Sequence, residues 1–307
     1  MDQGPLISGK MNRRDAIVLT TTGLAGCITP SLLSSGYIDA HSHIWTDDIK
    51  HFPLREGVKI EDLKPLRFTA DNLIQLGLTE RVTRHVLISH GPYHGFNNDY
   101  YTHAASRHPG IFSVVGAMNL SLDHIPARMR ANRKLRITGY RIKPNGDAHW
   151  LQSNPMQAMW KTGAAENIAM CPLINPKYVA DVGPMCRRFP DTTVVIDHCA
   201  RIDSQHKEEL SKLCALSKHP NVYVKISAFY AFGKKTPPYL DQIPKIKRLF
   251  ESFGPQQLMW ASDCPYQLEN GNTYDASISL VRDRLDFLSD TDKDWLLRRT
   301  AEKIFFN

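Results

Sequence analysis

The chain has 307 residues, of which 42% are hydrophobic and 22% are charged. This balance is typical of a globular protein and excludes a collagen-like, coiled-coil or largely disordered chain. Lysine and arginine exceed aspartate and glutamate by 38 − 31 = 7. Because the surplus is spread along the chain, we interpret it as an advantage for anionic small substrates and expect no nucleic-acid partner. No apolar run reaches the roughly 20 residues that a spanning helix needs.

Residues 1–35 are predicted to be an export signal and a short linker. Paired arginines at positions 13–14 precede a mildly apolar stretch, residues 16–26, as in a twin-arginine signal. The stretch runs into Leu-Ala-Gly-Cys at 24–27, a pattern that resembles a lipoprotein cleavage box with a lipid anchor at Cys27. We therefore expect an exported protein, either periplasmic or membrane-anchored. If the signal is spurious, the protein is cytoplasmic.

From Gly36 onward, β-rich runs alternate with amphipathic helical runs. The predicted strands are Gly36–Ile44, Val82–His90, Ile111–Asn119, Ile137–Lys143, Ala169–Asn175, Thr192–Cys199, Val222–Ala228 and Leu258–Pro265. The clearest predicted helices, with apolar residues three and four apart, are Ala70–Glu80, Ile125–Leu135, Lys207–Ser217, Thr273–Leu288 and Asp292–Phe305. Alternation of this kind indicates parallel strands joined by crossover helices. Eight such units favour a single domain over residues 36–307, an α/β protein of the closed (β/α)₈ TIM-barrel class.

In such a barrel the reacting side chains project from the carboxyl ends of the strands. The first predicted strand carries His41 and His43, and its alternation places both on one face with Asp39. Ile38 and Ala40 then fall on the other face, which we expect to pack on helices. Two imidazoles spaced in this way at a strand end can hold a metal ion or a substrate oxygen.

Two further strands end in polar residues after an apolar run. The sixth predicted strand ends in Asp197-His198, and the eighth reads Ala-Ser-Asp-Cys-Pro, with Asp263 at its centre. Taken alone, such a histidine is as often an ordinary hydrogen-bonded group, and such an aspartate is as often a turn or helix cap. Their common place at the mouth of one barrel makes the combination far more specific than its parts.

With these motifs in this order, the chain resembles the amidohydrolase superfamily. The resemblance is to the branch called amidohydrolase-2, which contains sugar-lactone and pyrone-dicarboxylate lactonases, and it covers roughly residues 36–307. It implies that His41 and His43 bind a divalent metal or, as in metal-free lactonases, the substrate carbonyl. It also implies that His198 steadies the developing oxyanion, and that Asp263 is the general base and a further metal ligand.

One departure concerns the metal. Many metal-dependent members have a histidine at the end of strand five, where this chain has Asn175. The departure counts against a dinuclear centre, whereas His41, His43 and Asp263 could still hold one Zn²⁺ with open positions for water and substrate. The sequence leaves open whether a metal is bound.

Cationic and aromatic residues near the predicted mouth indicate what binds there. Arg141 lies on the fourth strand, Lys225 on the seventh, and Arg201 shortly after His198. A buried lysine needs a partner, so Lys225 is expected to reach the mouth or to pair with an acid. We expect these cations, with Tyr93 from the loop after strand two, to bind a carboxylate-bearing small molecule.

Three functions follow from these residues. The first is a lactonase-type hydrolase, in which Asp263 activates water and the histidines polarise the carbonyl. The second is a zinc-dependent decarboxylase or hydratase that acts on an unsaturated carboxylic acid. The third is a barrel without catalytic activity that binds a sugar acid.

Overall fold

The computed structural model describes residues 30–307 except residue 204. The expected signal stretch and the expected lipid attachment at Cys27 lie outside the described residues. No helix in the described part of the chain is long and apolar enough to cross a membrane.

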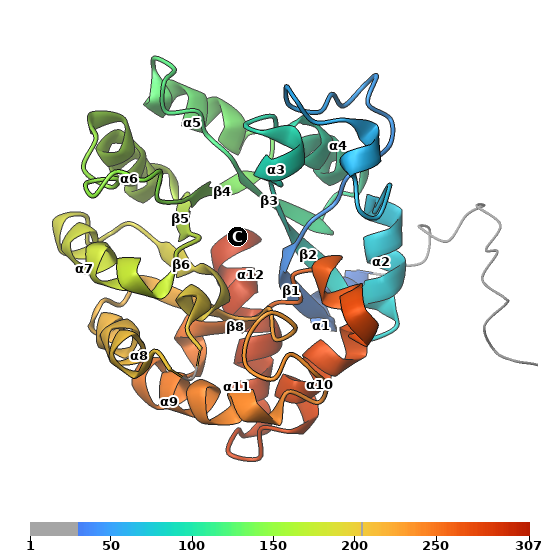
Figure 1. Cartoon of the computed structure of the whole chain (residues 1–307), viewed down its shortest axis with the longest axis vertical. Coiled ribbons are helices and arrows are strands. Elements are labelled where there is room, and N and C mark those ends of the chain that lie inside the picture. Colours follow the sequence, from blue (N-terminus) through green and yellow to red (C-terminus); the bar gives the residue numbers. More distant parts are fainter. Residues whose placement is uncertain (1–29, 204) are drawn as a thin grey trace, which may run out of the picture.

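All eight predicted strands are present and form one sheet in chain order, with every neighbouring pair parallel. They are β1 (Tyr37–Ser42), β2 (Val82–Ile88), β3 (Phe112–Gly116), β4 (Ile137–Ile142), β5 (Ala169–Pro172), β6 (Val194–Ile196), β7 (Val222–Ile226) and β8 (Leu258–Trp260). Each is shorter than predicted at its carboxyl end, where the chain leaves the ladder and turns into the loop that follows. Figure 1 shows the strands at the centre of a ring of helices, as the predicted TIM barrel requires.

The helices of the described residues lie outside the sheet, apart from the last one. They are α1 (Pro30–Ser35), α2 (Ala70–Leu78), α3 (Gly91–His94), α4 (Asp99–Arg107), α5 (Ile125–Arg133), α6 (Asn154–Glu166), α7 (Val179–Arg188), α8 (Lys207–Cys214), α9 (Ile243–Phe253), α10 (Tyr274–Asp283), α11 (Asp290–Asp294) and α12 (Thr300–Phe305). The helix predicted over Asp292–Phe305 is confirmed as one uninterrupted helical run from Asp290 to Phe305, in which a π-helical turn at Trp295–Arg299 joins α11 to α12.

Two apolar clusters hold the barrel together. The larger one lies between the strands and the surrounding helices. The smaller one lies inside the barrel. Its members from the strands, with Ala261 just after β8, are Ile38, Ala40, Val86, Ile88, Val115, Ala169, Cys171, Val195, Tyr223, Met259 and Ala261. Ala301 and Phe305 of α12 belong to the same inner cluster, and Figure 1 shows α12 in the middle of the ring of strands. Helix α12 therefore closes one end of the barrel, and the other end remains for chemistry.

The first strand departs from simple alternation. Its register against β2 shifts between Asp39 and Ser42. Ile38 and Ala40 therefore face the inside of the barrel, where they cluster with α12 and not with the helices outside the sheet. Asp39 does not share a face with the histidines either. Its carboxylate accepts hydrogen bonds from the Ser262 amide at 2.9 Å and from the Tyr274 hydroxyl at 3.0 Å. Asp39 thus joins β1 to the segment after β8, where the sheet closes.

Candidate active site

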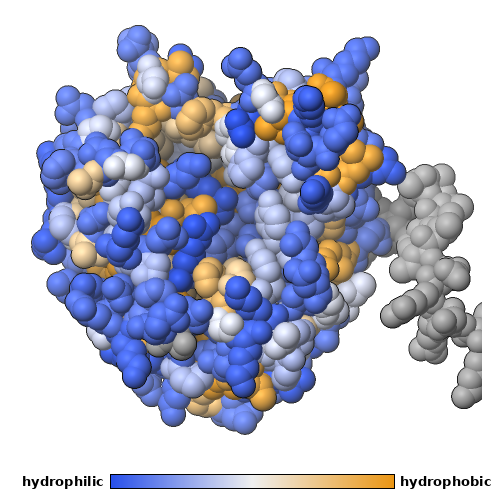
Figure 2. All heavy atoms as spheres, in the orientation of Figure 1, coloured by the Kyte–Doolittle hydropathy of each residue, from blue (hydrophilic) through white to orange (hydrophobic). Residues whose placement is uncertain are grey.

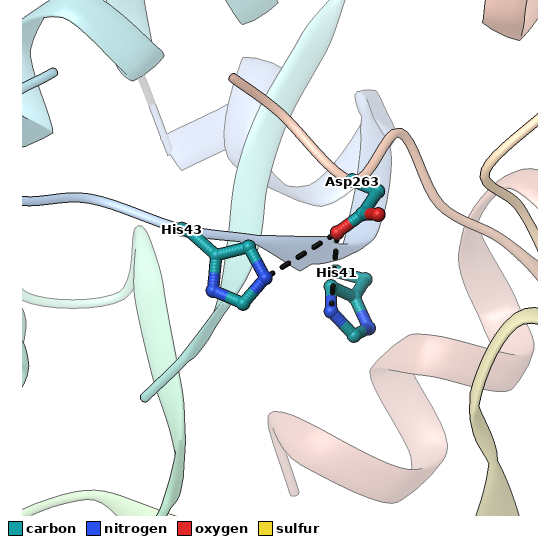
Figure 3. Close-up of side chains that lie close together, drawn as sticks. All are labelled: His41, His43 and Asp263. Carbon is teal, nitrogen blue, oxygen red and sulfur yellow. Dashed lines mark ion pairs between the residues drawn. The ribbon is translucent and has the colours of Figure 1, made fainter. Parts of the chain in front are cut away.

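The structure brings His41, His43 and Asp263 together at the carboxyl ends of β1 and β8 (Figure 3). Asp263 Oδ1 lies 3.4 Å from His41 Nε2 and 3.3 Å from His43 Nε2. Backbone hydrogen bonds fix this approach, since Asp263 N donates to His41 O at 2.8 Å and His43 N donates to Cys264 O at 2.7 Å. All three side chains are buried. Burial would raise the pKa of Asp263, but His198, His43 and His41 lower it far below its ordinary value.

The donor atoms of these three residues suit a metal ion. One ligand atom from each lies within 4.8 Å of the others, and two imidazoles with one carboxylate are a common zinc ligand set. His43 Nδ1 is 2.8 Å from the carbonyl oxygen of Ile88, which can only accept, so Nδ1 carries the proton. The Nε2 lone pair then faces the Asp263 carboxylate, and a proton or a cation between them would relieve that repulsion.

A guanidinium already lies against one of these donor atoms. Arg141 Nη2, from β4, is 2.7 Å from His41 Nε2 and 3.3 Å from Asp197 Oδ2. His41 Nδ1 lies 3.3 Å from Asp197 Oδ1. His41 Nε2 therefore accepts from Arg141 in the neutral form of the ring, Nδ1 lies 3.4 Å from Lys225 Nζ, and burial holds the pKa of His41 well below its ordinary value.

Asp197 is the centre of a buried charge cluster beneath the histidines. Its Oδ1 is 3.0 Å from Lys225 Nζ, and the side chains of both residues are essentially inaccessible to solvent. Burial would raise the pKa of Asp197, but Lys225 and His41 hold it well below the ordinary range. Of the two places expected for Lys225, the structure shows the one in which it pairs with an acid.

His198 lies on the turn Asp197–Arg201 that follows β6. The turn holds His198 in a left-handed conformation, with φ at 52°. His198 Nδ1 is 2.8 Å from Ser227 Oγ, and Nε2 is 3.8 Å from Asp263 Oδ2. Burial lowers the pKa of His198 to about 4, so the ring is neutral at ordinary pH.

The remaining predicted residues lie farther from this centre. Arg201 Nη1 donates to Asn175 Oδ1 at 3.1 Å, and Asn175 is exposed. The Tyr93 hydroxyl accepts from the Lys64 amide at 3.1 Å, and its ring packs edge-on against Trp45 with centroids 5.0 Å apart. Within the part of the chain that the structure describes, neither Arg201 nor Tyr93 forms a hydrogen bond with His41, His43 or Asp263. In the space-filling view, hydrophilic residues dominate this face of the molecule (Figure 2).

Sequence reasoning missed one residue that contacts the central carboxylate. The Tyr230 hydroxyl donates to Asp263 Oδ2 at 2.7 Å, and burial together with the neighbouring Asp263 charge raises the pKa of Tyr230 far above its ordinary value. Tyr230 lies in the loop after β7, where no periodicity marks it. Asp197 was visible as part of the Asp-His motif, but its role as the partner of Lys225 depends on the contact between β6 and β7.

Comparisons with known proteins show what the whole chain is similar to. A family model described as amidohydrolase matches residues 38–306. An L-fucono-1,5-lactonase from Burkholderia ambifaria is 27% identical over 237 residues, which cover 74% of this chain and 80% of that protein. A probable 2-pyrone-4,6-dicarboxylic acid hydrolase from Acinetobacter baumannii has a similar structure, with a TM-score of 0.75 and 20% identity over 89% of this chain and all of that one. A zinc-bound amidohydrolase from Burkholderia multivorans gives a TM-score of 0.71 at 20% identity, covering 89% of this chain and 99% of that one.

Proposed function

Because the chain belongs to the amidohydrolase family, we propose that this enzyme hydrolyses a lactone to a hydroxy acid. The observation that carries the proposal is the convergence of Asp263 with His41, His43 and His198 at the open end of the barrel. The similarity to a lactonase at 27% identity supports the same reaction class.

In the proposed reaction, Asp263 takes a proton from water as the water oxygen attacks the lactone carbonyl carbon. The tetrahedral intermediate then collapses, the ring C–O bond breaks, and the proton on Asp263 passes to the leaving alkoxide. The neighbours of Asp263 keep its carboxylate ionised, which is the state that a base needs before it can accept a proton. The product is a hydroxy acid, which balances the addition of one water, and its new carboxyl group then ionises and releases a proton to the solvent.

His198 is suited to stabilise the oxyanion. The Ser227 hydroxyl, 2.8 Å from His198 Nδ1, can donate to that nitrogen, which leaves the proton of the neutral ring on Nε2. That N–H then points toward Asp263 and the space above it, where the carbonyl oxygen would lie. Loss of one such donor typically lowers kcat by about 10²- to 10³-fold.

The ligand set fits a single divalent cation held by His41, His43 and Asp263. Such a cation would polarise the carbonyl and lower the pKa of a bound water. To ligate it through Nε2, His41 would have to give up its contact with Arg141, 2.7 Å away. With or without the cation, the proton transfer belongs to Asp263 and the stabilisation of the oxyanion belongs to His198.

We propose further that the substrate carries a carboxylate. Arg141 is 13% exposed at the floor of the site, and Arg201 lies at its rim, where Asn175 holds it. A guanidinium can bind a carboxylate through two parallel hydrogen bonds. Tyr93 offers an aromatic side wall, and Lys225 acts from below through Asp197.

Proton release from a panel of aldonolactones, uronic-acid lactones and pyrone carboxylates tests the proposed reaction. We expect acid release with at least one class, and its loss in Asp263→Asn. An enzyme silent on the whole panel that instead releases carbon dioxide from an unsaturated carboxylic acid would replace the lactonase proposal with a decarboxylase.

A further inference from the structure

Two sides of the Asp263 carboxylate have different partners. Oδ1 faces His41 and His43, at 3.4 and 3.3 Å. Oδ2 accepts a hydrogen bond from the Tyr230 hydroxyl at 2.7 Å. We propose that Tyr230 is the positioning residue of Asp263, fixing the rotation of its carboxylate so that Oδ1 stays directed at the histidines; for catalysis, this inference rests on the proposed function.

The backbone presents Tyr230 rigidly. Ala228 has φ at 57°, and the amide of Ala231 donates to the carbonyl of Ala228 at 3.0 Å, which closes a tight turn after β7. Phe229 is only 2% exposed and packs against the Tyr239 ring with centroids 5.7 Å apart. Because Phe229 anchors the turn in the core, the neighbouring Tyr230 is carried by a fixed element and not by a free loop.

A fixed rotation matters because the backbone hydrogen bonds of Asp263 hold its main chain and do not set the rotation of its carboxylate. It lies three residues beyond β8 in a left-handed conformation, with φ at 66°. Without the Tyr230 hydroxyl, Oδ2 would be drawn to the nearest remaining donor, His198 Nε2 at 3.8 Å. That movement would turn Oδ1 from the histidines and would occupy the His198 N–H that the proposed reaction reserves for the oxyanion. Tyr230 therefore keeps the base and the oxyanion donor separate.

Tyr230→Phe tests the proposal, since it keeps the ring and removes only the hydroxyl. On the lactone that the wild type hydrolyses, we expect kcat to fall about 10- to 100-fold with KM changed less than about twofold, because a small misplacement of a reacting group has costs of this order. Tyr239→Phe is the matched control, since it removes a hydroxyl that donates to Asn272 from the same loop and should keep kcat. Full kcat in Tyr230→Phe, or equal losses in both variants, would overturn the proposal.

A second measurement works without any substrate. The urea midpoints of unfolding of Tyr230→Phe, Asp263→Ala and the double variant form a double-mutant cycle. We expect the two single shifts not to add up to the double shift, because both substitutions break the same hydrogen bond. Additive shifts would overturn the positioning role. If the wild type hydrolyses no lactone, the proposed function fails, and the cycle alone then decides the role of Tyr230.

Discussion

Asp197 holds together three cationic or polar groups from three different strands. Lys225, Arg141 and His41 all lie within 3.3 Å of its oxygens. Breaking a buried ion pair from one side leaves the other charge uncompensated, which is strongly destabilising. This cluster therefore fixes the position of His41 and contributes to the stability of the barrel at the same place.

Lys225→Met should lower the free energy of unfolding by about 3–5 kcal/mol, because the lysine is fully buried on Asp197. Chemical denaturation checks this value. Adding Asp197→Asn to the Lys225→Met variant removes the unpaired carboxylate charge. The double variant should therefore recover most of the lost free energy of unfolding. A loss below about 1 kcal/mol in the single variant, which is what an exposed pair contributes, would show that this pair is not buried in solution.

Arg141→Met should strengthen Zn²⁺ binding by about tenfold or more. The guanidinium lies 2.7 Å from His41 Nε2, so it both occupies the lone pair and repels a dication. Competition with a fluorescent chelator measures the Kd. Arg201→Met, which removes a cation held by Asn175 at the rim, is the control and should change the Kd little. Equal Kd values for Arg141→Met and wild type would contradict the competition.

The sequence was enough to place His41, His43, His198 and Asp263 at one end of a barrel. Each lies at the carboxyl end of a strand, and parallel strands share that end of the sheet. It was not enough for their partners. The face expected for Asp39 was wrong, since alternation cannot show the register shift in β1. Tyr230 was missed because its place depends on a turn at Ala228. The roles assigned to His198, Arg201 and Tyr93 stay predictions.

At the scale of elements, α2 packs unusually close to β2. A Cβ at Gly77 would lie 2.6 Å from the His85 ring and 2.9 Å from the carbonyl oxygen of Val82. His85 is fully buried, and neither of its ring nitrogens has a hydrogen-bond partner among the described residues. Gly77 is therefore required by close approach and not by its backbone conformation.

Gly77→Ala should lower the free energy of unfolding by about 1–3 kcal/mol, since α2 must move from the sheet. Alanine would otherwise favour a helix by about 1 kcal/mol. Urea denaturation compares Gly77→Ala with the wild type. A Gly77→Ala variant that gains the roughly 1 kcal/mol of an unhindered helix position would refute the close packing.

The elements also mark the limit of periodicity. All eight strands were predicted correctly in kind and order, because each is an apolar run between amphipathic helices. The helix predicted over Asp292–Phe305 is confirmed as one helical run, but the apolar spacing gave no sign of its π-helical turn. Hydrogen bonding of the backbone, and not the pattern of side chains, decides where such a turn occurs.

At the scale of the whole molecule, buried histidines make stability depend on pH. Burial lowers the pKa of His85 to about 3, of His90 to about 2 and of His198 to about 4. In the unfolded chain each titrates near 6.5. Between these values the unfolded state binds more protons than the folded state, so stability is present above pH 6.5 and is lost as the pH falls.

Each of these histidines should reduce the free energy of unfolding by about 1 kcal/mol between pH 6 and pH 5. Denaturation at a series of pH values measures the slope. His85→Phe, which is remote from the proposed site, should remove one histidine's share of that slope. A variant with the wild-type slope would mean that His85 is protonated in the folded protein.

At the scale of the whole molecule, the two ends of the barrel also differ in what they can bind. Helix α12 fills one end with Ala301 and Phe305, so the residues that converge at the other end are the ones available for a substrate. In the proposed reaction, the oxygen of the attacking water must end on the carbonyl carbon of the lactone.

Hydrolysis in water enriched in oxygen-18, followed by mass spectrometry of the product, shows which carbon the water attacks. With the lactone identified by proton release, we expect one labelled oxygen in the new carboxylate and none in the new hydroxyl group. Label in the hydroxyl group would mean that water attacks the ring carbon instead, and would contradict the roles given to Asp263 and His198.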